Sequence, residues 1–165
     1  MSANLSYASE REFAVKAGFI FNFARYSEGN WFNPNLRNKY IICSYNPDFV
    51  LTASKTLNGQ KVKNRQVEVH LVSREGMPDD SCNSFFLTER NADLIEKVTR
   101  NENLTKTMLV GEMKAFVPSG GHINLFITGG KVRFEVNSDA LLDAGIKMSS
   151  KVLRLGRVVE GRRKQ

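Results

Sequence analysis

The sequence predicts a single three-layer α/β domain, in which helices flank a mixed β-sheet that ends in a C-terminal hairpin and a final helix. Short apolar segments alternate with helical patterns along the first part of the chain, as in strands joined by helices. Two strictly alternating segments around Gly129-Gly130 then predict an antiparallel hairpin. The 165 residues are enough for one domain with a sizeable core, and no linker or repeat divides them.

The first element is a helix that we expect to begin near Ser9 and to end by Gly29, because Ser9-Glu10-Arg11-Glu12 matches a capping box. Both of its sides are apolar, the first through Phe13, Ala17, Ile20, Phe21 and Ala24 and the second through Val15, Phe19 and Phe23. Such a helix is either buried within the monomer or shared with a second copy in a homodimer. Residues 1–8 are expected to precede the folded domain, which we assign to residues 9–160, and residues 161–165 to form a basic tail.

Short strands and helices alternate in the middle of the chain. Strands are predicted at residues 40–43, 66–71, 84–87 and 107–110, where apolar residues are continuous or alternate with polar ones. Asn46-Pro47 should begin a helix that Asn58-Gly59 ends, and Asn91 should cap a later helix.

The hairpin, residues Ile123–Val136, gives the clearest local pattern. Pairing Thr128 with Lys131 places Ile127 opposite Val132, and the same register places Leu125 opposite Phe134 and Ile123 opposite Val136. One face of the hairpin is therefore apolar and should pack on a core. A short helix stopped by Gly145 follows, and Ser149 should cap a last helix that runs through Val158.

Charge and hydropathy leave several partners open. The formal charge is +7, and no apolar run approaches the roughly 20 residues that cross a bilayer, so no direct membrane insertion is expected. The basic C-terminal residues are expected to form a solvated face and tail, since no nucleic-acid motif accompanies them. Met1–Asn4 shows no signal peptide, which indicates either a cytoplasmic protein or a leader already removed.

The two cysteines, Cys43 and Cys82, are too far apart for a CxxC motif or a zinc site, and only His70 and His122 could add imidazole ligands. From the residues alone, isolated buried thiols and a disulfide both remain open. Both histidines are expected to be exposed on strands, so a thiol–imidazole pair is not expected. Gly120-Gly121 precedes a strand rather than a helix, which favours a turn over a phosphate loop. We therefore expect no catalytic site, no metal and no cofactor.

Segments 17–26 (AGFIFNFARY), 41–43 (IIC), and 120–137 (GGHINLFITGGKVRFEVN) with 144–155 (AGIKMSSKVLRL) resemble the YfiR family of periplasmic regulators, in both order and spacing. The family's opening helix usually runs into Trp-Pro, whereas here Trp31 comes later. A second cysteine pair that some members carry is missing near Val117 and Asn124.

The resemblance implies an exported protein, its leader removed, that binds and represses a membrane-bound diguanylate cyclase or sensor kinase through the partner's periplasmic domain. It also implies a Cys43–Cys82 disulfide. A family pocket between the first helix and the turn at Ser149 makes Arg25, Tyr26, Trp31, Phe32 and Ser149 the expected partner- or ligand-binding residues. A small-ligand sensor is the alternative function. Arg25 could instead simply complement the helix dipole, and the aromatic residues could form an ordinary hydrophobic corner.

Overall fold

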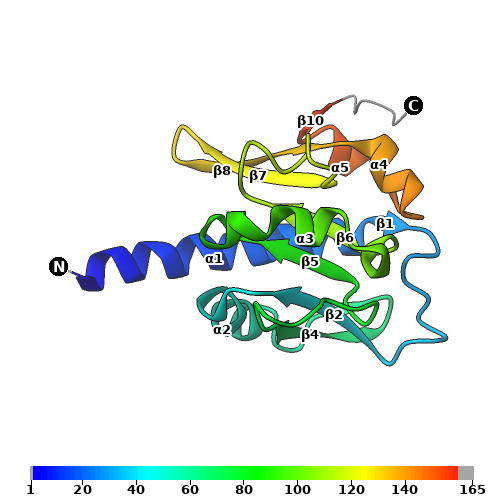
Figure 1. Cartoon of the computed structure of the whole chain (residues 1–165), viewed down its shortest axis with the longest axis horizontal. Coiled ribbons are helices and arrows are strands. Elements are labelled where there is room, and N and C mark those ends of the chain that lie inside the picture. The colour runs from blue at the N-terminus through cyan, green and yellow to red at the C-terminus, as the bar shows by residue number, and fades with distance from the viewer. Residues whose placement is uncertain (1, 160–165) are drawn as a thin grey trace.

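The computed structural model describes residues 2–159, with side chains from residue 10, and its centre is an eight-stranded mixed sheet (Figure 1). The strand order is β10-β8-β7-β6-β5-β2-β4-β3. These strands are β2 (Lys39–Ser44), β3 (Lys61–Val62), β4 (Arg65–Leu71), β5 (Ser84–Leu87), β6 (Met108–Gly111), β7 (Ile123–Thr128), β8 (Lys131–Val136) and β10 (Arg157–Val158). A separate two-stranded ribbon joins β1 (Ser27–Glu28) to β9 (Lys147–Met148).

The sheet is mixed because its central strands are parallel and its flanks are not. β4, β2, β5, β6 and β7 run parallel, β3 and β8 pair antiparallel with their neighbours, and β10 returns parallel to β8. Successive side chains of a strand point to opposite faces, so Phe86 faces one core cluster while Phe85 and Leu87 face another.

Helices cover both faces, which confirms the predicted three-layer α/β class. α1 (Ser2–Arg25), α2 (Pro47–Thr56), α4 (Ser138–Asp143) and α5 (Ser150–Leu153) cover the first face. The second face is covered by α3 (Ile95–Thr99) and the 3-10 helix η1 (Glu89–Leu94), with η2 (Glu102–Leu104) beside them. Asn46 caps α2 as predicted, whereas Thr88, and not Asn91, is the N-cap residue of η1.

Helix α1 begins at Ser2, earlier than the capping box indicated, and ends at Arg25. Its second apolar side is largely buried within the monomer, because Phe19 and Phe23 pack against Phe134 with ring centroids 6.0 and 4.9 Å away. Val15 stays exposed. The predicted limits of the domain stay a prediction, and the basic tail of residues 161–165 lies outside the described residues.

The hairpin has the predicted register throughout, from Ile123 opposite Val136 to Thr128 opposite Lys131. The final helix was predicted too long, since α5 ends at Leu153 and the chain then forms β10. Gly156 explains the change of structure: a Cβ atom there would lie 2.2 Å from the Phe134 ring, and glycine also disfavours helix. The chain therefore crosses Phe134 closely and joins the edge of the sheet.

Candidate functional site

The end of α1 forms a corner of the molecule together with the β1–β9 ribbon. Ser27 of β1 lies opposite Met148 of β9, and the Ser27 hydroxyl donates to the Phe23 carbonyl at 2.6 Å. This bond satisfies one of the carbonyl groups that a helix leaves unpaired at its C-terminus. The corner is thus held by backbone pairing on one side and by a side-chain cap on the other.

Two glycines allow the chain segments at this corner to touch. Gly29 has a φ of +131°, and a Cβ atom on it would lie 2.0 Å from the Gly145 carbonyl oxygen. Gly145 has a φ of +81°, and its Cβ would lie 2.2 Å from Asn30 Oδ1. Their local sequence predicted only helix ends at these glycines, because the contact joins residues that are distant along the chain.

Arg25 and Tyr26 lie on the surface of the corner and form a stacked pair. The Arg25 guanidinium lies 4.8 Å from the Tyr26 ring centroid and 5.5 Å from that of Phe21, and its Nη2 donates to the Tyr26 hydroxyl at 2.5 Å. Tyr26 is 45% exposed. Among the described side chains, no carboxylate lies within salt-bridge distance of Arg25. An anionic or acidic partner could therefore reach this cation.

Ser149 lies beside Tyr26 of this pair. Its N–H donates to the Tyr26 carbonyl at 2.8 Å, and its Oγ accepts from the Lys151 N–H at 3.2 Å as the N-cap of α5. The backbone bond fixes the spacing between the end of α1 and the start of α5. The exposed Lys151 adds a second positive charge to the same region.

Trp31 and Phe32 do not lie on this surface, because both are buried around Tyr40. The Phe32 and Tyr40 ring centroids are 4.9 Å apart, and Trp31 Nε1 donates to the Tyr40 hydroxyl at 3.4 Å. That hydroxyl also bonds Ser84 Oγ at 2.6 Å, and burial raises the pKa of Tyr40 to about 12. Trp31 and Phe32 therefore support the corner from inside.

Two shallow hollows lie elsewhere on the described surface, and neither includes Arg25 or Ser149. One, near the corner, is lined by Gly29, Asn30, Phe32, Asn33, Pro34, Leu36, Lys63 and Lys106. The other lies between α2 and β4. Arg25 and Tyr26 are both exposed, and neither of these hollows reaches them.

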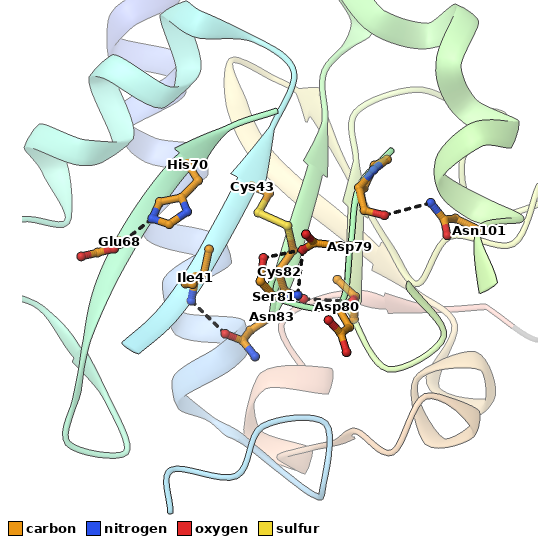
Figure 2. The surroundings of a disulfide bond; sticks show 12 residues. Ile41, Cys43, Glu68, His70, Asp79, Asp80, Ser81, Cys82, Asn83 and Asn101 are labelled. Carbon is orange, nitrogen blue, oxygen red and sulfur yellow. Dashed lines mark hydrogen bonds and ion pairs between the residues drawn. A yellow bond between two sulfur atoms is a disulfide. The ribbon is translucent and has the colours of Figure 1, made fainter. Parts of the chain in front are cut away.

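The implied disulfide is present between Cys43, at the end of β2, and Cys82, just before β5 (Figure 2). The two Cα atoms are 5.8 Å apart, and both cysteines are buried. Neighbouring Asn83 binds both backbone groups of Ile41: its N–H donates to the Ile41 carbonyl at 2.8 Å, and its Oδ1 accepts from the Ile41 N–H at 2.9 Å. A side-chain clamp and a covalent bond therefore join the same two strands.

The histidines differ in environment. His70 is exposed as predicted, and its ring binds the Glu68 carboxylate at 2.9 Å. The prediction for His122 was wrong: it is buried, and its Nδ1 accepts from the Leu109 N–H at 2.9 Å. Burial lowers the pKa of His122 to about 4, so the ring is neutral at ordinary pH.

The described residues offer neither a metal site nor a membrane span. Within residues 10–159, no cluster of three His, Cys, Asp or Glu side chains is placed to hold a metal ion. No helix in the described part of the chain has the length and apolarity needed to cross a bilayer.

The fold occurs in several solved structures, including the following two. One is an ABC domain from Streptococcus pneumonia in complex with L-Trp, with 15% identity and a TM-score of 0.50, covering 77% of this chain and 56% of that one. The other is a conserved domain protein from Vibrio cholerae, with 15% identity and a TM-score of 0.50, covering 73% of this chain and 54% of that one. The chain thus spans just over half of each, and at this identity the likeness concerns the fold alone. Among curated proteins, no sequence matches the chain.

A family comparison gives the more specific result. The YfiR/HmsC-like family model matches residues 13–157, which contain all of the corner, the disulfide and the hairpin. The members of this family are, in general, periplasmic regulators of diguanylate cyclases rather than enzymes. Because the match covers nearly the whole chain and agrees with its motifs, this chain belongs to the YfiR/HmsC-like family.

Proposed function

We propose that this chain is a non-catalytic periplasmic protein that binds and represses the extracytoplasmic domain of a membrane-bound signalling enzyme, most directly a diguanylate cyclase. The observation that carries the proposal is the exposed Arg25–Tyr26 pair beside Ser149, in a chain of this family. Arginine and aromatic side chains are enriched where protein interfaces concentrate their binding energy.

The rigidity of the corner supports a binding role. The Gly29–Gly145 approach, the Ser27 cap and the Ser149–Tyr26 bond fix the surface before a partner arrives. A preorganised surface loses less entropy on binding. In a two-state mechanism, the bound cyclase is held inactive, and any change that weakens the contact releases its activity.

Other described features support a non-catalytic protein in an oxidising compartment. The two cysteines are held in a disulfide, which is typical of exported proteins, and a disulfide sulfur is no thiolate nucleophile. The buried, neutral His122 is engaged with the backbone.

A binding experiment tests the proposal directly. The extracytoplasmic domain of each membrane-bound diguanylate cyclase of the source bacterium is purified in isolation. Calorimetry then measures the affinity of each domain for this protein. We expect Arg25→Glu to weaken binding at least about ten-fold, equivalent to about 1.4 kcal/mol. Arg100→Glu is the matched control, since Arg100 is an exposed arginine on the opposite face of the sheet.

A cyclase assay in membranes then measures repression, as the fall in cyclic di-GMP formed from GTP when this protein is added. Wild-type protein and Arg100→Glu should repress, and Arg25→Glu should not. Equal binding and repression by all three proteins would rule out the Arg25 surface. The absence of binding to any of the cyclase domains would exclude the cyclase as partner.

A further inference from the structure

The hollow near the corner lies beside the loop that joins β1 to β2. Its volume is about 510 Å³, within the range of roughly 300 to 1,000 Å³ that is typical of small-molecule sites. Eight residues line it, whereas a stable protein–protein interface takes roughly 20 to 30 residues from each partner. The hollow therefore suits a small molecule better than a second protein.

Hydrogen bonds hold the loop that forms one wall of this hollow. The Pro34 carbonyl accepts from Arg65 Nε of β4 at 2.8 Å. The Asn33 carbonyl accepts from the Leu36 N–H at 3.0 Å, and Asn33 Oδ1 accepts from the Asn35 N–H at 2.9 Å. The wall is thus formed before any ligand binds, which reduces the entropy lost on binding.

Lys63 supplies one positive charge to the hollow. It forms the two-residue turn between β3 and β4 together with Asn64, and the two residues have φ values of +48° and +67°. The Lys63 Nζ lies 5.8 Å from the centroid of the buried Trp31 ring, within the range of a cation–π contact. A tight turn and a buried ring therefore fix the position of this charge.

A carboxylate of the chain itself already binds Lys63. Glu28 Oε2 accepts from the Lys63 Nζ at 2.9 Å, yet the Glu28 side chain is 83% exposed. An exposed ion pair contributes little to stability, and an ammonium group has three donors. A carboxylate from solution can therefore join Glu28 at Lys63 or replace it.

Lys106 supplies a second positive charge. It lies between η2 and β6 and is exposed. Among the described side chains, no carboxylate lies within salt-bridge distance of Lys106. None of the residues that line the hollow is acidic. Two lysines without a lining acid make the hollow attractive to anions.

The lining also has an apolar part, formed by Phe32, Pro34 and Leu36. Leu36 is 81% exposed, more than any other large hydrophobic side chain that the structure describes. Covering it with an apolar group would remove this surface from water, which favours binding. The hollow therefore offers an aliphatic surface next to two cations.

We infer that this hollow binds a small carboxylate that carries an alkyl chain. The carboxylate binds to Lys63 and Lys106, and the alkyl chain covers Pro34 and Leu36. The inference is independent of the proposed cyclase partner, because neither Arg25 nor Ser149 lines the hollow and the test requires no cyclase.

An NMR titration of the whole chain with octanoate, kept below the concentration at which it forms micelles, tests the inference. We expect a Kd of about 1 mM or less, with shifts of the Asn33, Leu36 and Lys63 amide signals. Acetate lacks the alkyl chain and octylammonium has the opposite charge, so both should bind at least about ten-fold more weakly.

Three outcomes of this titration would overturn the inference. The first is the absence of shifts at these amides up to about 10 mM octanoate. The second is an equal response to octylammonium, because the charge of the ligand would then be irrelevant. The third is a set of shifts centred on Tyr26 and Ser149, because octanoate would then bind the Arg25 surface.

Lysine variants test which charges bind the carboxylate. Combining Lys63→Met with Lys106→Met should weaken octanoate binding at least about ten-fold, whereas Lys63→Arg, which keeps the charge, should bind within about two-fold of the wild-type chain. Lys131→Met is the matched control, because Lys131 is an exposed lysine on β8, near the other edge of the sheet. Undiminished binding by the double variant would refute the site.

Removing the competing carboxylate gives a test that a misfolded variant cannot pass. Glu28→Gln leaves Lys63 without its internal acid, so octanoate should bind at least about two-fold more tightly. A purely structural role of Lys63 would produce no such gain. Unchanged or weaker binding in Glu28→Gln would overturn the inference.

Discussion

The Lys16 ammonium donates to the Glu112 carboxylate at 2.6 Å, and the two side chains are only 5% and 10% exposed. Lys16 lies on α1, and Glu112 directly follows β6. The second oxygen of Glu112 accepts from the Glu89 N–H at 2.8 Å, and Lys16 also reaches Glu12 at 3.0 Å. This polar contact fixes α1 over the carboxyl ends of the parallel strands.

Removing one member of this pair should destabilise the fold strongly. We expect Glu112→Ala to lower the free energy of unfolding by about 2 to 3 kcal/mol, because the buried Lys16 ammonium keeps only the partly exposed Glu12 carboxylate and the Glu89 N–H loses its acceptor. Combining Lys16→Met with Glu112→Leu should recover much of the loss. Urea unfolding measures all three proteins. Arg100→Ala, which breaks an exposed pair, should change stability by less than about 1 kcal/mol.

The disulfide should contribute a comparable amount. The two cysteines are 39 residues apart, so the chain-entropy model gives about 4 kcal/mol lost in Cys43→Ser with Cys82→Ser. Denaturant curves with and without reductant should show this difference for the wild-type chain and none for the double variant. Two thiols that alkylate freely in the unfolded, unreduced protein would contradict the disulfide itself.

Acid should destabilise the protein through His122. Its pKa is about 4 when folded and 6.5 ordinarily, so the unfolded chain binds the proton more readily. The stabilisation is fully present above pH 6.5 and is lost as pH falls toward 4, by about 3 kcal/mol at most. Urea unfolding at several pH values in this range gives the free energy of unfolding as a function of pH. That free energy should fall less steeply with acid in His122→Gln than in the wild-type chain. If the pH dependence of the unfolding free energy were the same in both proteins, groups other than His122 would cause the acid sensitivity.

The glycine contact at the corner should tolerate no side chain. Gly29→Ala combines a φ of +131° with a Cβ 2.0 Å from the Gly145 carbonyl oxygen. Gly59→Ala isolates the conformational cost, since its φ is +80° and no atom lies within 4 Å of its Cβ. Thermal unfolding should show a loss of about 1 to 2 kcal/mol for Gly59→Ala and a clearly larger one for Gly29→Ala. Equal losses of stability in the two variants would show that the backbone at Gly29 and Gly145 moves apart at no cost to admit the added methyl group.

Short-range sequence patterns correctly predicted the elements whose structure depends on residues that are neighbours in the chain. The hairpin register followed from a period of two and a glycine turn, and the α2 cap followed from Asn46-Pro47. The length predicted for the last helix was wrong, because the helical pattern gives no information about the contact of Gly156 with Phe134. That contact forms only in the folded chain.

The same limit applies to the candidate site. Alternation into β7 placed His122 away from one core, but it could not show that the layer on the other face of the sheet covers this position. Trp31 and Phe32 follow Arg25 closely in sequence, and only their packing on Tyr40 shows that they are interior. The expectation that Arg25 lies near Ser149 came from the family resemblance, since no local rule joins residues so far apart.

The two hydrogen bonds between Asn83 and Ile41 make the pairing of the sheet independent of the redox state of the cysteines. If a reductant opened the disulfide, β2 and β5 would still be held in register by those two hydrogen bonds and by their own ladder. The added backbone mobility would be confined to residues 72–81. This segment connects β4 to β5, and the disulfide at Cys82 anchors its far end. Reduced and oxidised molecules would then share one architecture and differ in the motion of a single surface segment.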